Sequence, residues 1–242
     1  MKILKHLSLA VIILGVLIFL FSSPVFSNSL LSPEALDVIS EKDVIIIFNS
    51  GGWGNTPLEE ALDFAPVIQG IQEDLNQFGY DAVVITFNRT KDNFWGKVAG
   101  AKDFFSSFSF SSEVLAKDLE DLVNRFPDKK IVMAGLSNGA TFTTKTYEKM
   151  SVKARESVYA ISAGLPFWVE TEKEQNLLQL DNNGKDSLAI GDAFSLLGSL
   201  LKAPRKWLAE IKTEQIAAGH LYPWERPEVG SKIITFLGNK LQ

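Results

Sequence analysis

Short apolar runs alternate with helical patterns along the chain from Asp43 onward. The first run, Asp43–Phe48, is rich in β-branched residues, as expected for a strand that is buried on both faces of a sheet. Apolar positions between residues 58 and 78 then recur at helical spacing, and Gly79 follows them where a helix commonly ends. We therefore expect a strand at 43–48 and a helix at 58–78.

The same alternation continues through the rest of the chain, while the stretch 88–111 is less regular. Further strands are expected at 82–87, 130–134, 158–162, 176–180 and 207–216, and further helices at 115–126, 141–150, 193–201 and 231–237. Strands that alternate with helices imply βαβ units, and therefore an α/β fold with a mostly parallel sheet and helices on both faces. No internal repeat or low-complexity linker divides the chain, so one domain is expected over residues 28–242.

A different pattern occupies residues 1–27. Two lysines precede an apolar run, Leu7–Phe21, and a short polar stretch, Ser22–Ser27, follows it. This order is typical of a secretory signal peptide, here cut after Ser27. The alternative is an uncleaved anchor with membrane association through residues 7–26, a stretch long enough to span a bilayer. Both interpretations place the domain outside the cytoplasm, because the lysines stay inside.

Composition narrows the classes of function. The chain has 242 residues, of which 46% are hydrophobic and 22% charged, the profile of a globular protein. A net charge of −5 without a Lys/Arg cluster argues against nucleic acid as a partner, because phosphate binding requires a basic surface. The lack of cysteine excludes disulfides, thiolate catalysis and cysteine-ligated zinc.

A nucleophile is indicated by Gly135–Gly139, which has the pattern G-x-S-x-G centred on Ser137. The pattern follows an expected buried strand and opens an expected helix. In this setting a sharp turn exposes a serine hydroxyl at the carboxyl end of a sheet. The two glycines let neighbouring elements approach closely, and the helix N-terminus favours negative charge. The alternative is an ordinary glycine-rich turn in which Ser137 caps the helix.

Only two histidines occur, His6 and His220, and His6 lies in the predicted export segment. A site with several histidines is therefore excluded once that segment is removed, and no metal or cofactor is expected. One histidine still suffices as the base of a serine nucleophile. His220 follows the last expected strand, so it should reach the same sheet edge as Ser137. The alternative is a surface histidine without a chemical role.

Three segments together resemble the α/β-hydrolase superfamily. The turn at 135–139 resembles the nucleophile elbow of that family, and Asn49–Gly54 resembles its oxyanion loop. Gly219–Pro227, with the helix expected behind it, resembles the closing segment of the family. The resemblance spans residues 43–237 and implies an α/β-hydrolase fold for the domain at 28–242.

The chain departs from the family pattern at two places. Asn49-Ser50 stands where members often have His-Gly, and Ala140 stands where many members have a second glycine. Neither change removes a catalytic group, but both leave the subfamily open.

The resemblance also implies an acid that orients His220 and stabilises its protonated form. Asp186 lies in Asn182–Leu188, which resembles the glycine-then-aspartate loop of the family. Its alternative role is that of a surface turn residue. Asp192, at the start of the next expected helix, is the second candidate acid, and its alternative role is that of a helix cap. Asp181 is a third candidate.

Two backbone amides are expected to stabilise the negative charge that develops on the acyl oxygen. The resemblance assigns these to Asn138, directly after the nucleophile, and to Gly51 in the loop after the first strand. Together these residues predict a serine hydrolase that cleaves a carboxylic ester or related acyl substrate through an acyl-enzyme, with a small molecule as the substrate. The alternatives are an acyltransferase with the same residues and a non-catalytic ligand-binding protein.

Aromatic residues crowd the segment 94–110, with others at Trp53, Phe167 and Trp168. Those in the segment are Phe94, Trp95, Phe104, Phe105, Phe108 and Phe110. Walls of an apolar pocket and ordinary core packing are both compatible with this pattern.

Overall fold

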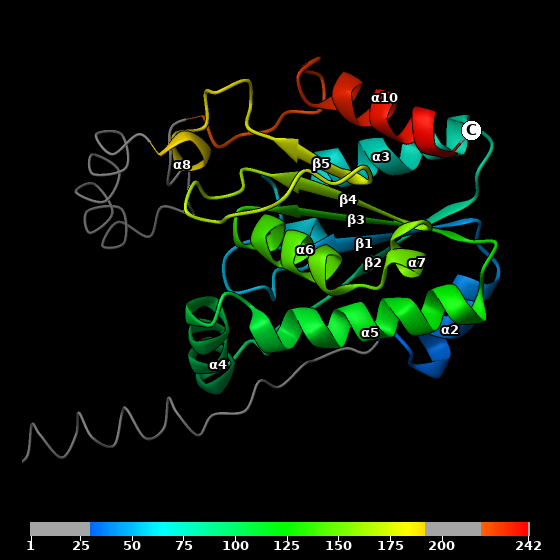
Figure 1. Cartoon of the computed structure of the whole chain (residues 1–242), viewed down its shortest axis with the longest axis horizontal. Helices are drawn as coiled ribbons and strands as arrows, with labels where there is room; N and C mark the ends of the chain where they lie inside the picture. Colours follow the sequence, from blue (N-terminus) through cyan, green and yellow to red (C-terminus); the bar gives the residue numbers. More distant parts are fainter. Residues whose placement is uncertain (1–29, 192–218, 242) are drawn as a thin grey trace, which may run out of the picture.

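The computed structural model describes residues 30–191 and 219–241 (Figure 1). Several expected features lie outside these residues: the apolar segment 7–26, the helix at 193–201, the strand at 207–216 and Asp192. No helix within the described ranges is long and apolar enough to cross a membrane.

Five parallel strands form one sheet in the order β2-β1-β3-β4-β5. The strands are β1 (Val44–Asn49), β2 (Ala82–Thr86), β3 (Lys130–Leu136), β4 (Val158–Ala163) and β5 (Leu177–Leu180). Each lies within two residues of an expected strand. Every residue of β1 and β4 is buried, because helices cover both faces of the sheet. The predicted α/β class with a parallel sheet is confirmed.

The helices form two layers, one on each face of the sheet (Figure 1). One layer contains α3 (Ala65–Gln77) and α10 (Gly230–Leu241). The other contains α2 (Pro33–Ser40), α5 (Ser109–Arg125), α6 (Asn138–Lys149) and the short α7 (Val152–Arg155). Alternate residues of β1 pack on opposite faces of the sheet. Val44 and Ile46 belong to the core under α3 and α10, whereas Ile45 belongs to the core on the other face. This alternation follows from the two-residue period of a strand.

The helix expected at 58–78 is interrupted. A 3-10 turn, η1 (Leu58–Glu60), precedes α3, which begins only at Ala65. Pro66 lies in the first turn of α3, where the missing N–H costs no hydrogen bond. A proline in the middle of one continuous helix would have broken it, so the apolar period alone was misleading here.

The irregular stretch 88–111 contains α4 (Phe94–Phe105) and the start of α5, neither of which was expected. The side chain of Asn93 caps α4 by accepting a hydrogen bond from the amide of Gly96 at 2.7 Å. Aromatic residues of α4 are exposed, with Phe94 at 68% and Phe105 at 76%. The helix was missed because its apolar residues do not form one stripe that faces the core.

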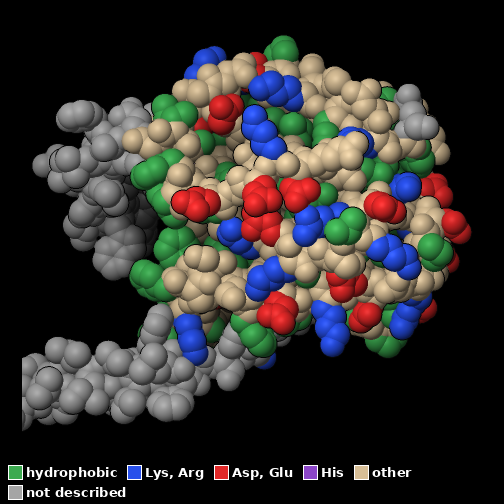
Figure 2. All heavy atoms as spheres, in the orientation of Figure 1, with side chains coloured by type: hydrophobic (Ala, Val, Ile, Leu, Met, Phe, Trp, Pro, Cys, Tyr) green, Lys and Arg blue, Asp and Glu red, His purple; other side chains and the backbone are tan. Residues whose placement is uncertain are grey.

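The side chains seen in Figure 2 differ between two parts of the surface. Acidic and basic side chains are interspersed over the face that carries α5, α6 and α7. Hydrophobic side chains are prominent at the end of the molecule where α4 and the short α8 (Ser187–Ile190) lie. The strands β1, β3 and β4 have their carboxyl ends on this side of the molecule.

Candidate active site

Ser137 occupies the turn between β3 and α6. Its φ of 57° and ψ of −115° are unfavourable for a residue with a side chain, and such conformations cost on the order of 1–3 kcal/mol. The amide of Ser137 donates to the carbonyl of Ala163 at 2.9 Å, so the end of β4 holds the turn in place. The side chain remains partly exposed at the carboxyl edge of the sheet. The predicted strand–turn–helix setting is present.

The two glycines of the turn are required by close backbone contacts. A Cβ atom at Gly135 would lie 2.4 Å from the carbonyl oxygen of Gly139. A Cβ atom at Gly139 would lie 2.1 Å from the carbonyl oxygen of Asn49. No side chain fits at either position without movement of the backbone, which explains the spacing of the motif.

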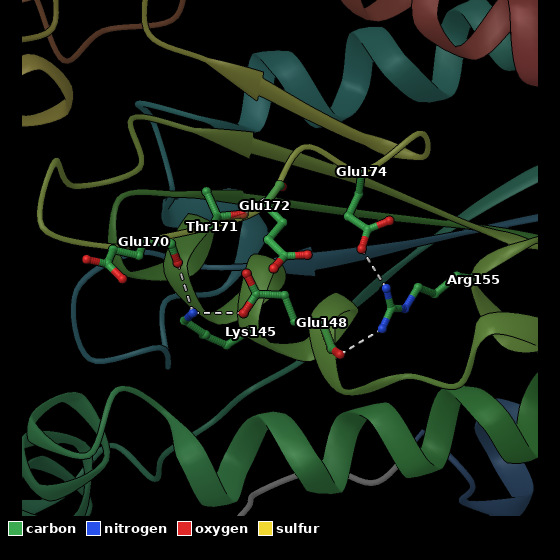
Figure 3. A pocket seen from close by; sticks show the side chains of 7 residues that line it. All are labelled: Lys145, Glu148, Arg155, Glu170, Thr171, Glu172 and Glu174. Carbon is green, nitrogen blue, oxygen red and sulfur yellow. Dashed lines mark hydrogen bonds and ion pairs between the residues drawn. The ribbon is translucent and has the colours of Figure 1, made fainter.

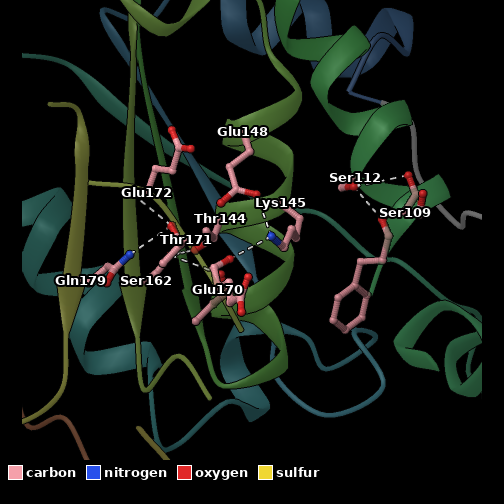
Figure 4. A network of polar contacts seen from close by, with 12 residues as sticks. Ser109, Ser112, Thr144, Lys145, Glu148, Ser162, Glu170, Thr171, Glu172 and Gln179 are labelled. Atoms are coloured by element: carbon pink, nitrogen blue, oxygen red, sulfur yellow. Dashed lines mark hydrogen bonds and ion pairs between the residues drawn. The ribbon is translucent and has the colours of Figure 1, made fainter. Parts of the chain in front are cut away.

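Buried hydroxyl groups fasten α6 to the sheet directly behind this turn (Figure 4). Thr144 Oγ1 and Ser162 Oγ are 2.8 Å apart, and Ser162 Oγ donates to the carbonyl of Ala140 at 3.2 Å. Nearby, Asn49 Nδ2 donates to Thr143 Oγ1 at 2.9 Å. These bonds join the first turns of α6 to β4 and β1. They fix the start of the helix that directly follows Ser137.

The structure brings His220 and Asp186 together. His220 Nδ1 lies 2.7 Å from Asp186 Oδ2, and the Asp186 side chain is fully buried. Burial alone would raise the pKa of Asp186, but the hydrogen bonds from His220 and Tyr222 hold it below its usual value. Asp186 is therefore an ionised carboxylate at neutral pH, and the proton on His220 Nδ1 faces it.

Asp186 also caps α8 with its other oxygen. Oδ1 accepts hydrogen bonds from the amides of Leu188 at 2.9 Å and Ala189 at 3.3 Å. Asp186 is thus the N-cap residue of α8, a short helix that the sequence analysis did not expect. The expected alternative for Asp186, a surface turn residue, is excluded by its burial.

Tyr222 is a third partner of this carboxylate, and sequence reasoning missed it. Its hydroxyl donates to Asp186 Oδ2 at 2.6 Å, and the side chain is buried. Burial and the neighbouring carboxylate of Asp186 raise the pKa of Tyr222, so the phenol keeps its proton. Its position two residues after His220 was the available signal.

The end of β4 connects the serine turn with the histidine. Ala163 accepts the hydrogen bond from the Ser137 amide, and Gly164 follows with a φ of 62°. A Cβ atom at Gly164 would lie 2.5 Å from His220 Cε1 and 2.8 Å from Asp186 Oδ2. Two adjacent residues of the chain therefore contact Ser137 and the His220–Asp186 pair.

The predicted oxyanion residues lie next to the same turn. A Cβ atom at Gly51 would lie 3.2 Å from the carbonyl oxygen of Leu136, the residue before the serine. The side chain of Asn138 donates to the carbonyl of Gly52 at 3.1 Å and so ties the loop to the start of α6. Among the described residues, the amides of Gly51 and Asn138 have no hydrogen-bond partner. This lack of an acceptor is what the predicted oxyanion role of the two amides requires.

The aromatic residues divide into two groups. Phe108 is buried and packs in the core against Phe142. The others are exposed to various degrees: Trp53, Phe94, Trp95, Phe104, Phe105, Phe110, Phe167 and Trp168. Core packing therefore accounts for only one of them, and for the exposed ones the pocket wall stays a prediction.

A separate hollow of about 600 Å³ lies beside α6, α7 and the segment after β4 (Figure 3). Its lining residues are Lys145, Glu148, Arg155, Glu170, Thr171, Glu172 and Glu174. Both cations are paired, Lys145 with Glu148 and Arg155 with Glu174, each at 2.7 Å. The lining contains no serine or histidine, so its chemistry is that of surface ion pairs, and the serine turn is the better candidate for a reaction.

Replacing Tyr222 by phenylalanine is expected to lower kcat by roughly tenfold, because a hydrogen bond to a charged group contributes about 1.5–3 kcal/mol. The pKa of Asp186 is lowered by folding, so its stabilising effect is present above its ordinary pKa of 3.8 and is lost as the pH falls through the folded value. Without the phenol the folded value rises, and acid unfolding should begin at a higher pH.

Steady-state kinetics and melting temperatures across the acid range measure both effects. Tyr159→Phe is the matched control, because Tyr159 is also buried but its hydroxyl donates to the carbonyl of Lys240, away from the site. Equal kinetics and equal acid stability for the two variants would contradict the role given to Tyr222.

Comparison with known proteins shows a likeness in fold. No family model and no curated protein sequence matches this chain. A Trichoderma reesei cutinase, solved in complex with a C11Y4 phosphonate inhibitor, is 14% identical with a TM-score of 0.56, over 83% of this chain and 77% of the cutinase. An acetyl xylan esterase is 14% identical with a TM-score of 0.50, over 82% of this chain and 98% of the esterase. The chain thus has the α/β-hydrolase-like fold of these esterases, which confirms for the fold the resemblance seen in the sequence.

Proposed function

We propose that this protein is a serine hydrolase that cleaves a carboxylic ester or related acyl substrate through an acyl-enzyme. The observation that carries the proposal is the junction at the end of β4. There, the carbonyl of Ala163 accepts a hydrogen bond from the strained turn of Ser137, and Gly164 contacts both His220 and the buried Asp186. The likeness in fold to a cutinase and an acetyl xylan esterase supports ester hydrolysis over other reactions.

In the proposed first step, Ser137 Oγ attacks the acyl carbon and its proton passes to His220 Nε2. This nitrogen is the free one, because Nδ1 faces Asp186. The oxyanion that forms accepts hydrogen bonds from the amides of Gly51 and Asn138. The adduct then collapses, the bond to the alkoxide oxygen breaks, and His220 gives its proton to the departing alcohol.

Water completes the cycle by the reverse sequence. It loses a proton to His220 Nε2, attacks the acyl-enzyme, and releases the carboxylic acid together with the free hydroxyl of Ser137. Asp186 stays ionised throughout and stabilises the imidazolium, as its lowered pKa favours. An acyltransferase would use an alcohol in place of water at this step.

The exposed aromatic residues near this edge of the sheet favour substrates with apolar acyl or alcohol groups. We also propose that the domain works outside the cytoplasm, on the basis of the lysine-flanked apolar run at 7–21. The intact mass of the exported protein distinguishes a chain that starts near Asn28 from one that keeps the segment.

A fluorophosphonate probe is expected to label the purified protein at Ser137, because the probe reacts with serines that a neighbouring base activates. Peptide mass spectrometry of the adduct identifies the residue. Ser137→Ala should abolish labelling, whereas Ser231→Ala, at an exposed serine of α10, should leave it unchanged. A well-folded wild type that is not labelled would refute the hydrolase and favour a ligand-binding protein.

The products of turnover separate the two enzymatic alternatives. With an activated ester in water, a hydrolase forms the free acid even when an alcohol is added. Transfer of most acyl groups to a dilute alcohol would identify an acyltransferase instead.

A further inference from the structure

The loop Ser50–Gly54 is held from one side by two residues that follow β2. The amide of Arg89 donates to the carbonyl of Gly54 at 2.7 Å, and its Nη2 donates to the carbonyl of Ser50 at 2.9 Å. The hydroxyl of Thr90 donates to the carbonyl of Trp53 at 2.9 Å. Three carbonyls of one short loop are therefore bound by two adjacent residues of the chain.

Other groups bind the remaining carbonyls of the loop. Gly51 accepts a hydrogen bond from the amide of Gly54 at 3.0 Å, and Gly52 accepts one from the side chain of Asn138. Every carbonyl from Ser50 to Gly54 thus has a donor, whereas the Gly51 amide has no partner among the described residues. This pattern fixes the loop while it keeps that amide available.

Arg89 is an unusual residue to find at this position. Its side chain is 3% exposed and lies over the rings of Phe108 and Phe142, at 4.7 and 5.0 Å from their centroids. Burial lowers the pKa of Arg89 to about 10, against the opposing effect of Asp103, so it is charged at neutral pH.

Asp103 is a buried carboxylate whose charge acts on Arg89, but the two make no direct ion pair. A buried cation without a direct ion pair is costly, and an apolar residue would stabilise the fold at least as well. No carboxylate among the described residues lies within 4 Å of the Arg89 guanidinium. Gly54 admits the guanidinium, because a Cβ atom there would lie 2.3 Å from Nε. The guanidinium of Arg89 therefore contacts the backbone of the Ser50–Gly54 loop and makes no direct ion pair with a described residue.

We propose that Arg89 and Thr90 are positioning residues that hold the Ser50–Gly54 loop in the conformation that offers the Gly51 amide to the oxyanion. The inference rests on the proposed function and assigns the support of its oxyanion site. Donors that are held in place before the reaction stabilise the developing charge without reorganisation, and this lowers the barrier. Neither residue needs to contact the substrate.

Three variants test the proposal on full-length protein: Arg89→Met removes the guanidinium, Arg89→Lys keeps a charge but loses the planar fork, and Thr90→Val removes one hydroxyl. We expect Arg89→Met to lower kcat by about 10- to 100-fold and Thr90→Val by a few-fold, less than the ~10²–10³ seen when an oxyanion donor is itself removed. KM for an activated ester should change little, and Arg89→Lys should fall between Arg89→Met and wild type.

The affinity for a phenylboronic acid separates a positioning role from a purely structural one. The compound forms a tetrahedral adduct on an active serine, so its binding depends on the oxyanion site and not on overall stability. Its affinity should weaken in proportion to kcat across the variants, and the pH dependence of kcat should keep its shape. Leu237→Ala, in the opposite core under α10, is the control. It should lower the melting temperature while kcat and boronate affinity stay as in wild type.

The outcomes separate this inference from the proposed function. If wild type is labelled at Ser137 and turns over, but Arg89→Met and Thr90→Val keep wild-type kcat and boronate affinity, the positioning role is wrong and the hydrolase stands. If Arg89→Met does not fold, an unchanged Thr90→Val overturns the proposal and a kcat loss with weaker boronate binding supports it. If wild type is neither labelled nor active, both fail together.

Discussion

Removing Ser137 or His220 is expected to lower kcat by about the same factor, on the order of 10⁶, and removing both should cost little more than removing either. In the proposed mechanism the two side chains act in one proton transfer, so removing either residue already abolishes that transfer. Independent contributions would instead multiply. The variants Ser137→Ala, His220→Ala and the double variant, measured on one activated ester, give this comparison directly.

The folds of these variants should stay close to wild type. Alanine carries a Cβ atom as serine does, so the φ of 57° at position 137 should cost it no more, and hydrogen bonds of the backbone hold the turn. His220 is partly exposed. Its removal leaves the carboxylate of Asp186 with three of the four hydrogen bonds that it accepts from described residues. Melting temperatures check this point. A double variant far slower than either single variant would show that the two residues do not work as a unit.

Asp186→Asn is expected to lower kcat by up to ~10⁴, the penalty known for loss of the acid in such triads. The two carboxylate oxygens of Asp186 have different partners: Oδ1 caps α8, and Oδ2 faces His220 and Tyr222. The amide oxygen of asparagine can still cap α8 in place of Oδ1, so the fold should persist. Its NH₂ group then replaces Oδ2, faces His220 Nδ1 as a second donor, and favours the tautomer with a proton on Nε2. That tautomer cannot accept the proton of Ser137.

The controls for this prediction are the two other aspartates that the sequence offered. Asp181 is exposed, and Asp181→Asn should remain active. Asp192→Asn should also stay active, with at most the roughly 0.5–2 kcal/mol loss of stability that a helix cap contributes. Values of kcat and melting temperature for all three variants decide the matter. A silent Asp192→Asn beside an active Asp186→Asn would assign the acid to the other aspartate.

The strands were predictable because a strand that is buried on both faces of a sheet appears in the sequence as a short continuous run of apolar residues. The first five residues of β1, Val44–Phe48, are all apolar, and such a run is visible in a short window of the sequence. The helix α4 was not predictable in this way, since its aromatic residues point partly to solvent and do not form one apolar stripe. The break before α3 required the position of Pro66 to be weighed against the apolar period.

The sequence by itself determined the α/β alternation, the glycine-flanked turn at Ser137 and the single histidine downstream of it. Each of these depends on neighbouring residues, because secondary structure and turn geometry are set locally. Only the tertiary structure decided that Asp186 meets His220, that Tyr222 shares this carboxylate, and that the guanidinium of Arg89 binds the carbonyl of Ser50. These contacts join residues 34, 36 and 39 positions apart, and no local pattern encodes which pair will meet. They arise because the parallel sheet brings the ends of its strands, and the loops after them, to one edge.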